Sequence, residues 1–126
     1  MDILSASGAP NAVGPYSHAV RVGGLLFCSG QVALDPETNT LVGDDVAAQT
    51  EQVLANIRAV LAAAGADLSA VIKTTVLLDS IDDFKTVNEV YARAFGDHRP
   101  ARSAFAVEAL PLGALVEIEV IAEVGS

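Results

Sequence analysis

Hydrophobic residues recur along the chain with two different spacings, one typical of helices and one of strands. From Val46 to Ala64 they lie three or four residues apart, as on one face of an α-helix. Asp44 or Asp45 is placed to cap the start of this helix, and Gly65 to end it. A second helix is predicted from Ser80 to Gly96. Its apolar stripe consists of Phe84, Val87, Tyr91, Ala94 and Phe95.

Strands alternate with these helices. The clearest is the β-branched run Val71–Leu78, and others are predicted at Leu25–Leu34, 103–110 and 115–124, with one more at 19–23. The order of elements predicts an α+β fold, in which a mixed sheet carries two helices packed on one face. The length of 126 residues fits a single domain, 1–126.

The last strand indicates how the sheet is oriented. One set of alternate positions is wholly apolar: Val116, Ile118, Val120, Ala122 and Val124. The other set contains Glu117, Glu119, Ile121 and Glu123. A sheet with one uncovered and partly apolar face commonly buries that face in an oligomer.

Charge and cysteine content narrow the functional classes. Seven Lys and Arg stand against sixteen Asp and Glu, which gives a net charge of −9. Such a chain repels nucleic acid and anionic membrane surfaces, and a site for small acids must supply its own local cation. The sole cysteine, Cys28, excludes an internal disulfide and is expected to be a buried small hydrophobe. We expect a cytoplasmic protein with neither signal peptide nor transmembrane segment.

Arg102 is the first candidate for chemistry, because it leads into the apolar run Ala104–Leu110. A guanidinium can grip a carboxylate with two parallel hydrogen bonds. The carboxylate could belong to a small-molecule ligand. It could equally belong to the chain, in an ion pair with Glu108, Glu117 or Glu119.

Glu117 lies within the apolar strand 115–124, and two interpretations stay open. It is either part of a solvated outer face or a partly desolvated general acid or base with a raised pKa. If 103–110 and 115–124 form a hairpin, Arg102 and Glu117 lie about 20 Å apart. One ligand then contacts both only if they come from different subunits.

The remaining candidates are less specific. Asn88, near the stripe of the second helix, is either a packing amide or a ligand contact. Tyr16 is either a loop anchor or a hydroxyl donor to a site. Ser29 has no paired base nearby in sequence, so a nucleophilic role is unsupported. His18 and His98 lack the spacing of metal ligands, and no metal is expected.

Several short motifs, taken in order, resemble the RidA/YjgF family of reactive intermediate deaminases. The likeness runs from about residue 5 to residue 124. The motifs are Gly14-Pro15-Tyr16, Ser29-Gly30-Gln31, Val71-Ile72-Lys73-Thr74-Thr75-Val76, Val87-Asn88-Glu89-Val90-Tyr91, Pro100-Ala101-Arg102-Ser103 and Glu117-Ile118-Glu119.

The resemblance implies a chorismate-mutase-like fold and a homotrimer with its sites at subunit interfaces. It implies cofactor-free hydrolysis of 2-imino acids and their enamines, such as 2-aminoacrylate, 2-iminobutanoate and 2-iminopropanoate, to 2-keto acids and ammonia. Arg102 would hold the substrate carboxylate, and Glu117 would position the attacking water and transfer its proton. Tyr16, Ser29 and Asn88 would line the pocket.

The chain departs from the family pattern in two places. Ala104 stands where many members have a cysteine, and it keeps a ligand contact there only if that contact is made by the backbone. The connection Gly96-Asp97-His98-Arg99 is short for the family, and Arg99 adds a second cation beside the site.

Three rival functions follow from the same residues. One is a non-catalytic protein that binds or senses keto acids. Another is a relative specialised for a different imine-like or carbamate-like substrate. The third is RNA cleavage, against which the net charge and the lack of a basic stripe argue.

Overall fold

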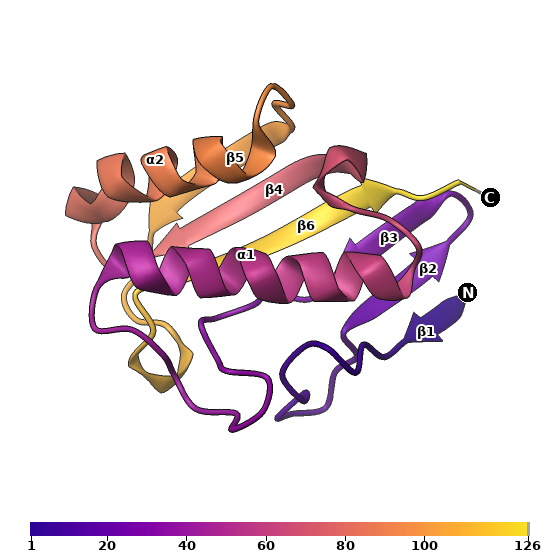
Figure 1. Cartoon of the computed structure of the whole chain (residues 1–126), viewed down its shortest axis with the longest axis horizontal. Helices are drawn as coiled ribbons and strands as arrows, with labels where there is room; N and C mark the ends of the chain where they lie inside the picture. Colours follow the sequence, from indigo (N-terminus) through magenta and orange to yellow (C-terminus); the bar gives the residue numbers. More distant parts are fainter. Residues whose placement is uncertain (126) are drawn as a thin grey trace.

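The structure, a computed structural model, describes residues 1–125 as two layers, a six-stranded sheet and two α-helices (Figure 1). The strands lie in the order β1-β2-β3-β6-β4-β5. Their bounds are β1 (Asp2–Leu4), β2 (Ala19–Val22), β3 (Leu25–Cys28), β4 (Val71–Leu78), β5 (Ala101–Ala106) and β6 (Val116–Glu123). The helices are α1 (Val46–Ala63) and α2 (Phe84–Phe95).

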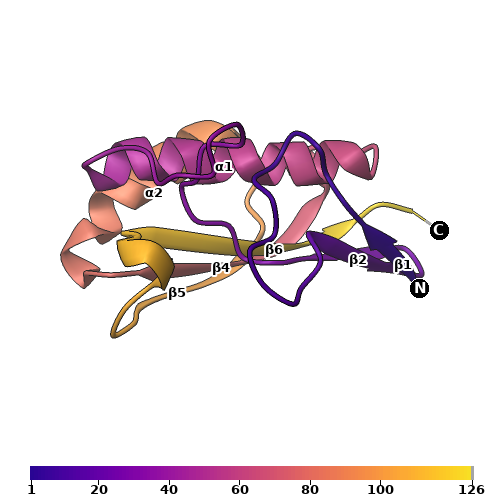
Figure 2. The same ribbon diagram turned by 90° about the horizontal axis from the view of Figure 1, so that it is seen from below.

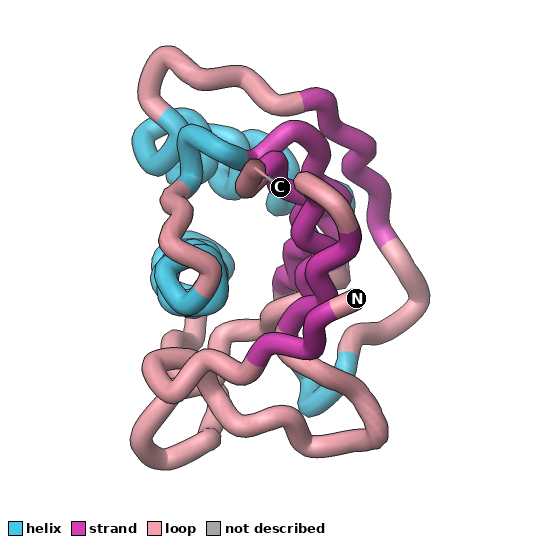
Figure 3. Tube along the Cα trace, turned by 90° about the vertical axis from the view of Figure 1, so that its right-hand side faces the viewer, coloured by secondary structure: helices cyan, strands magenta, loops and turns pink. Residues whose placement is uncertain are grey.

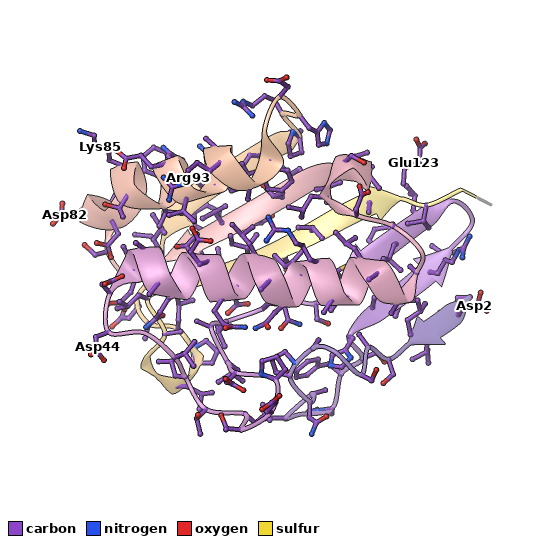
Figure 4. All side chains as sticks on the ribbon, in the orientation of Figure 1. Asp2, Asp44, Asp82, Lys85, Arg93 and Glu123 are labelled. Carbon is purple, nitrogen blue, oxygen red and sulfur yellow. The ribbon has the colours of Figure 1, made fainter. Side chains whose placement is uncertain are left out.

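Both helices lie on the same side of the sheet (Figure 2), and seen from one end they form a layer separate from the strands (Figure 3). The predicted mixed sheet with two helices on one face is therefore confirmed. We call the side opposite the helices the open face. Of the charged side chains labelled in Figure 4, Arg93 lies between the two helices, and the others project from the periphery of the molecule.

Both helices begin and end at residues whose chemistry explains the boundary. The Asp45 side chain accepts a hydrogen bond from the Ala48 N–H at 2.8 Å and caps α1, and Gly65 follows its end at φ 73°. α2 starts at Phe84, later than predicted, because Ser80 caps a 3-10 turn that precedes it. Gly96, at φ 63°, ends α2.

The central strand β6 lies between β3 and β4 and is antiparallel to both. Its side chains alternate as predicted. Val116, Ile118, Val120 and Ala122 are buried beneath the helices, where they meet buried residues of α1 such as Leu54, Ile57 and Leu61. Glu117, Glu119, Ile121 and Glu123 point to the open face.

The predicted hairpin of 103–110 with 115–124 is wrong. β5 pairs in parallel with the outer edge of β4, and β6 pairs with the opposite edge. The reason is the α2 crossover, which returns the chain beside β4 in the same direction. The connection after β5 then passes through a 3-10 turn at Pro111–Gly113 and reaches the other side of β4.

The strand predicted at Leu25–Leu34 is shorter than expected, because β3 ends at Cys28. Only Gln31 rejoins the sheet, through two backbone hydrogen bonds with Ile118 at 2.9 and 3.1 Å. After Gln31, a side chain of the helix layer holds the segment in place. The buried Asn56 amide donates to the carbonyls of Val32 at 3.2 Å and Leu34 at 2.9 Å. One polar side chain of α1 thus fixes a segment that has left the sheet.

We expect Asn56→Leu to lower the free energy of unfolding by about 2 kcal/mol, because the buried Leu34 carbonyl loses its donor and the Val32 carbonyl keeps only the Leu34 N–H. Urea denaturation at fixed protein concentration measures this. The control is Gln52→Ala, which removes only the 2.9 Å bond to Asn56 Oδ1 and should cost less than about 1 kcal/mol. Equal stability of Asn56→Leu and the wild type would contradict the role of the amide.

Candidate functional site

Three of the predicted site residues line one cavity of about 460 Å³, which we call the Glu117 cavity. Tyr16 comes from the N-terminal loop, Ser29 follows β3, and Glu117 comes from β6. The rest of the lining is mainly apolar: Val13, Gly30, Val32, Leu34, Pro111 and Leu112, together with Glu119. The cavity therefore combines two carboxylates with a mostly apolar wall.

Glu117 is half-buried on the open face, beside the backbone of Gly30. A Cβ atom at residue 30 would collide with Glu117 Oε2, so the glycine leaves the space that the carboxylate occupies. Burial raises the pKa of Glu117, and the neighbouring charge of Glu119 raises it further. A carboxyl group with a raised pKa beside a cavity is suited to exchange a proton with a bound molecule.

Ser29 and Tyr16 have hydroxyls that can bind a ligand but lack an activating base. Ser29 Oγ donates to the Ser17 carbonyl at 2.6 Å, so its lone pairs remain available to accept a hydrogen bond. The Tyr16 hydroxyl accepts from the Val13 N–H at 3.4 Å and keeps its own proton for donation. Both alternatives for Tyr16 are therefore compatible, because a loop anchor can also donate to a ligand.

Arg102 and Asn88 line a second cavity, of about 330 Å³, which we call the Arg102 cavity. The other lining residues are Tyr91, Ala92, Arg99 and Pro100. Arg102 Nη1 donates to Asn88 Oδ1 at 2.7 Å, which orients the guanidinium. The Asn88 amide therefore positions the Arg102 side chain. This role is neither the packing amide nor the direct ligand contact that the sequence left open.

Arg102 makes none of the three ion pairs that the sequence allowed. Within residues 1–125, the one ion pair is Arg93–Glu51, at 3.6 Å on the exposed surface between the helices. The guanidinium of Arg102 instead lies over two aromatic rings, 5.0 Å from the Tyr91 centroid and 5.4 Å from that of Phe84. Its charge thus has no carboxylate counterion in the described chain.

This aromatic support of Arg102 was not predicted from the sequence. Phe84 and Tyr91 were assigned to the apolar stripe of α2, and Tyr91 is indeed buried. However, its hydroxyl is hydrogen-bonded to Thr74 Oγ1 at 2.8 Å, and Thr74 is the partner of Arg102 in the β4–β5 ladder. The spacing of residues 84, 88 and 91 on one helix face was the available signal.

Ala104 lines neither cavity. It is paired with the buried Val76 on the helix side of the sheet and packs partly buried against the core. An alanine therefore fits the position without strain, and its side chain is directed away from the open face.

The two cavities lie on opposite faces of the sheet. Arg102 is level with Thr74 on β4 and Glu117 is level with Leu77, and positions three apart on one strand point to opposite faces. The register places their Cα atoms about 14 Å apart, closer than the mistaken hairpin suggested. One small ligand still cannot contact both side chains of the same chain, because the sheet separates them.

No group of three potential metal-ligating side chains occurs among residues 1–125. Both ring nitrogens of His18 are engaged, since Nδ1 accepts from the Ala6 N–H at 2.8 Å and Nε2 donates to the Pro10 carbonyl at 2.7 Å. Burial raises the pKa of Cys28 to about 12, which makes this thiol a poor nucleophile. In the same part of the chain, no helix is long and apolar enough to cross a membrane.

The chain is similar to known proteins over almost its whole length. The family model described as Endoribonuclease L-PSP matches residues 6–124. Reactive Intermediate Deaminase A, chloroplastic, of Arabidopsis thaliana is 51% identical over 121 residues, which are 96% of this chain and 65% of the plant protein. The human 2-iminobutanoate/2-iminopropanoate deaminase is 48% identical over 120 residues, which are 95% of this chain and 88% of the human protein.

A solved structure that is similar to this chain also comes from a protein named RidA. The crystal structure of RidA from an Antarctic Psychrobacter is 44% identical, with a TM-score of 0.94, and the match covers 98% of this chain and 99% of that one.

We expect Gly30→Ala to displace the Glu117 carboxylate from its position. Because the colliding atom is the end of a flexible side chain, the carboxylate should move while the backbone stays, and the loss in free energy of unfolding should be below about 1 kcal/mol. A crystal structure of the variant tests this, with Gly8→Ala as the control, since its Cβ would meet only Ala59 at 3.5 Å. An unmoved Glu117 in Gly30→Ala would contradict the close approach.

Proposed function

Since the chain belongs to the RidA/YjgF family, whose model carries the description Endoribonuclease L-PSP, we propose that it is a hydrolytic deaminase. It converts reactive 2-imino acids and their enamine tautomers, such as 2-iminobutanoate, 2-iminopropanoate and 2-aminoacrylate, to 2-keto acids and ammonia. The observation that carries the proposal is the Arg102 guanidinium, oriented by Asn88 and without a carboxylate partner in the described chain. In a chain of net charge −9, such a cation is suited to a small acid.

The substrate carboxylate would bind to Arg102. One guanidinium nitrogen, Nη1, is already used by Asn88, and the aromatic rings of Tyr91 and Phe84 limit movement of the group. A guanidinium held in this way loses little further freedom when it binds a carboxylate. The substrate C2 atom is then placed at a fixed distance from the cation.

Glu117 would position the water that attacks C2 of the imine. As the water oxygen bonds to C2, its proton passes through the carboxylate to the nitrogen, and the tetrahedral intermediate then loses ammonia to give the keto acid. The raised pKa of Glu117 supports this exchange of a proton, because the carboxylate is a stronger base than an ordinary glutamate. Ser29 and Tyr16 would provide hydrogen bonds to the same bound molecule.

A complete site would then form between two copies of the chain, the Glu117 cavity of one meeting the Arg102 cavity of the other. The opposite placement of the two cavities supports this arrangement. So does the open face, where Phe27 and Phe105 are 42% and 48% exposed. We propose a homotrimer in which the open faces point inward, and the Arg102 cavity, at the edge strand β5, reaches the Glu117 cavity of the neighbouring copy. Ala104, on the edge strand β5, would contribute to the site through its backbone.

The other functions have weaker support. RNA cleavage corresponds to the description of the family model, but the net charge of −9 would repel a phosphate backbone. Binding of keto acids without turnover would use the same Arg102 clamp. The protein would need neither a metal nor a cofactor for any of these roles, and we expect it to work in the cytoplasm.

Hydrolysis is tested by generating 2-iminobutanoate with a threonine dehydratase in the presence of semicarbazide, which traps the free imine. The protein should lower the yield of trapped product, and Arg102→Ala should lower kcat/KM about 100-fold, because a charge-assisted carboxylate contact is lost. The control, Arg93→Ala, removes the exposed ion pair with Glu51 and should retain activity within about twofold. Binding of 2-ketobutyrate in calorimetry without turnover would favour the sensing role instead.

The shared site is tested by co-expressing Arg102→Ala and Glu117→Ala chains and isolating mixed oligomers by two affinity tags. If each site takes one residue from each of two neighbouring subunits, one of the three sites in every mixed trimer regains both residues, so about one third of the sites should be active. Each variant alone should stay inactive. Mixed oligomers with no more activity than the parents would contradict a site formed between subunits.

A further inference from the structure

The Arg102 cavity has an unusual charge for this protein. Two of the seven Lys and Arg residues of the chain, Arg99 and Arg102, line it, and no acidic residue does. The clamp proposed above uses only Arg102. A substrate with a single carboxylate therefore leaves one cation of the cavity without a counterion.

Arg99 is held in place by its own loop. Its Nη1 donates to the carbonyls of Gly96 and His98, the latter at 3.0 Å. Both acceptors are neutral, so the charge is positioned but not compensated. The other N–H groups of the guanidinium have no acceptor among residues 1–125, which leaves them free to bind an anion.

Tyr91 lines the same cavity as Arg99 and Arg102, so both cationic residues lie beside one tyrosine. Burial raises the pKa of its hydroxyl, while the hydrogen bond with Thr74 and the charges of Arg102 and Arg99 lower it. Both guanidinium charges therefore act on the hydroxyl of one residue that lines the cavity. Two fixed donors around a small hollow suit a ligand with two anionic groups.

We propose that Arg99 binds a second carboxylate, so that the site accepts dicarboxylic 2-imino acids such as 2-iminosuccinate and 2-iminoglutarate. The inference rests on the proposed deaminase function and adds a substrate class to it. Arg102 holds the carboxylate beside the imine carbon, and Arg99 holds the distal one. The reaction is unchanged: water adds to C2, the C–N bond breaks, and the products are a dicarboxylic keto acid and ammonia.

The test compares two substrates in three proteins. Amino-acid oxidases with catalase generate 2-iminoglutarate and 2-iminobutanoate in the semicarbazide assay, and kcat/KM is measured for wild type, Arg99→Gln and the control Arg93→Gln. In Arg99→Gln the ratio of kcat/KM for 2-iminoglutarate to that for 2-iminobutanoate should fall about tenfold. In Arg93→Gln, whose guanidinium pairs with Glu51 outside the cavity, the ratio should stay at the wild-type value.

Calorimetry with 2-ketoglutarate and 2-ketobutyrate separates failure of this inference from failure of the proposed function. An unchanged ratio in Arg99→Gln, with 2-iminobutanoate still hydrolysed by wild type, overturns the role of Arg99 and leaves the deaminase in place. If wild type hydrolyses neither imine, the deaminase is wrong. In that case, the binding of a second carboxylate by Arg99 is supported if Arg99→Gln selectively loses affinity for 2-ketoglutarate. It is overturned if the affinities for both keto acids change equally.

Discussion

The alternation of side chains along β6 is the constraint on which the rest of this structure depends. A strand in the middle of a sheet presents every second residue to each face, and here the helices cover only one of these faces. The apolar half of the alternation forms the centre of the core with α1. The other half must then lie on the open face, and this is how an acidic residue comes to lie at a cavity within an otherwise apolar strand.

The same constraint explains why the candidate site is divided. Arg102 leaves the sheet on the helix side, where α2 supplies an amide and two aromatic rings to hold it. Glu117 leaves on the open side, where Gly30 makes room for it. No change of rotamer brings the two together through a hydrogen-bonded sheet. The guanidinium and the carboxylate of one chain are thereby prevented from neutralising each other, and both remain available to a ligand.

The sequence predicted what depends on local pattern. The bounds of α1 and β4 follow from periodicity, capping and β-branching, and the alternation of β6 was read directly from its residues. The pairing of β5 was mispredicted because periodicity does not distinguish a parallel crossover from a hairpin. Similarly, Phe84 and Tyr91 have the spacing of an ordinary core stripe, and only the tertiary arrangement shows a guanidinium above them. Gly30 stands out only as part of the motif Ser29-Gly30-Gln31, and the reason for the glycine is not visible in the sequence, since it lies in a side chain from a distant strand.

The position of β5 at the edge of the sheet has a consequence for how such a protein can change over time. The loop that carries Arg99 joins α2 to this edge strand, so insertions, deletions or exchanges there leave the central strands and their register intact. The carboxylate on the far face is insulated from those changes by the sheet itself. The proposed recognition of the substrate and the proposed activation of water can therefore diversify separately, one through changes in an exposed loop and the other under the close packing of the protein's centre.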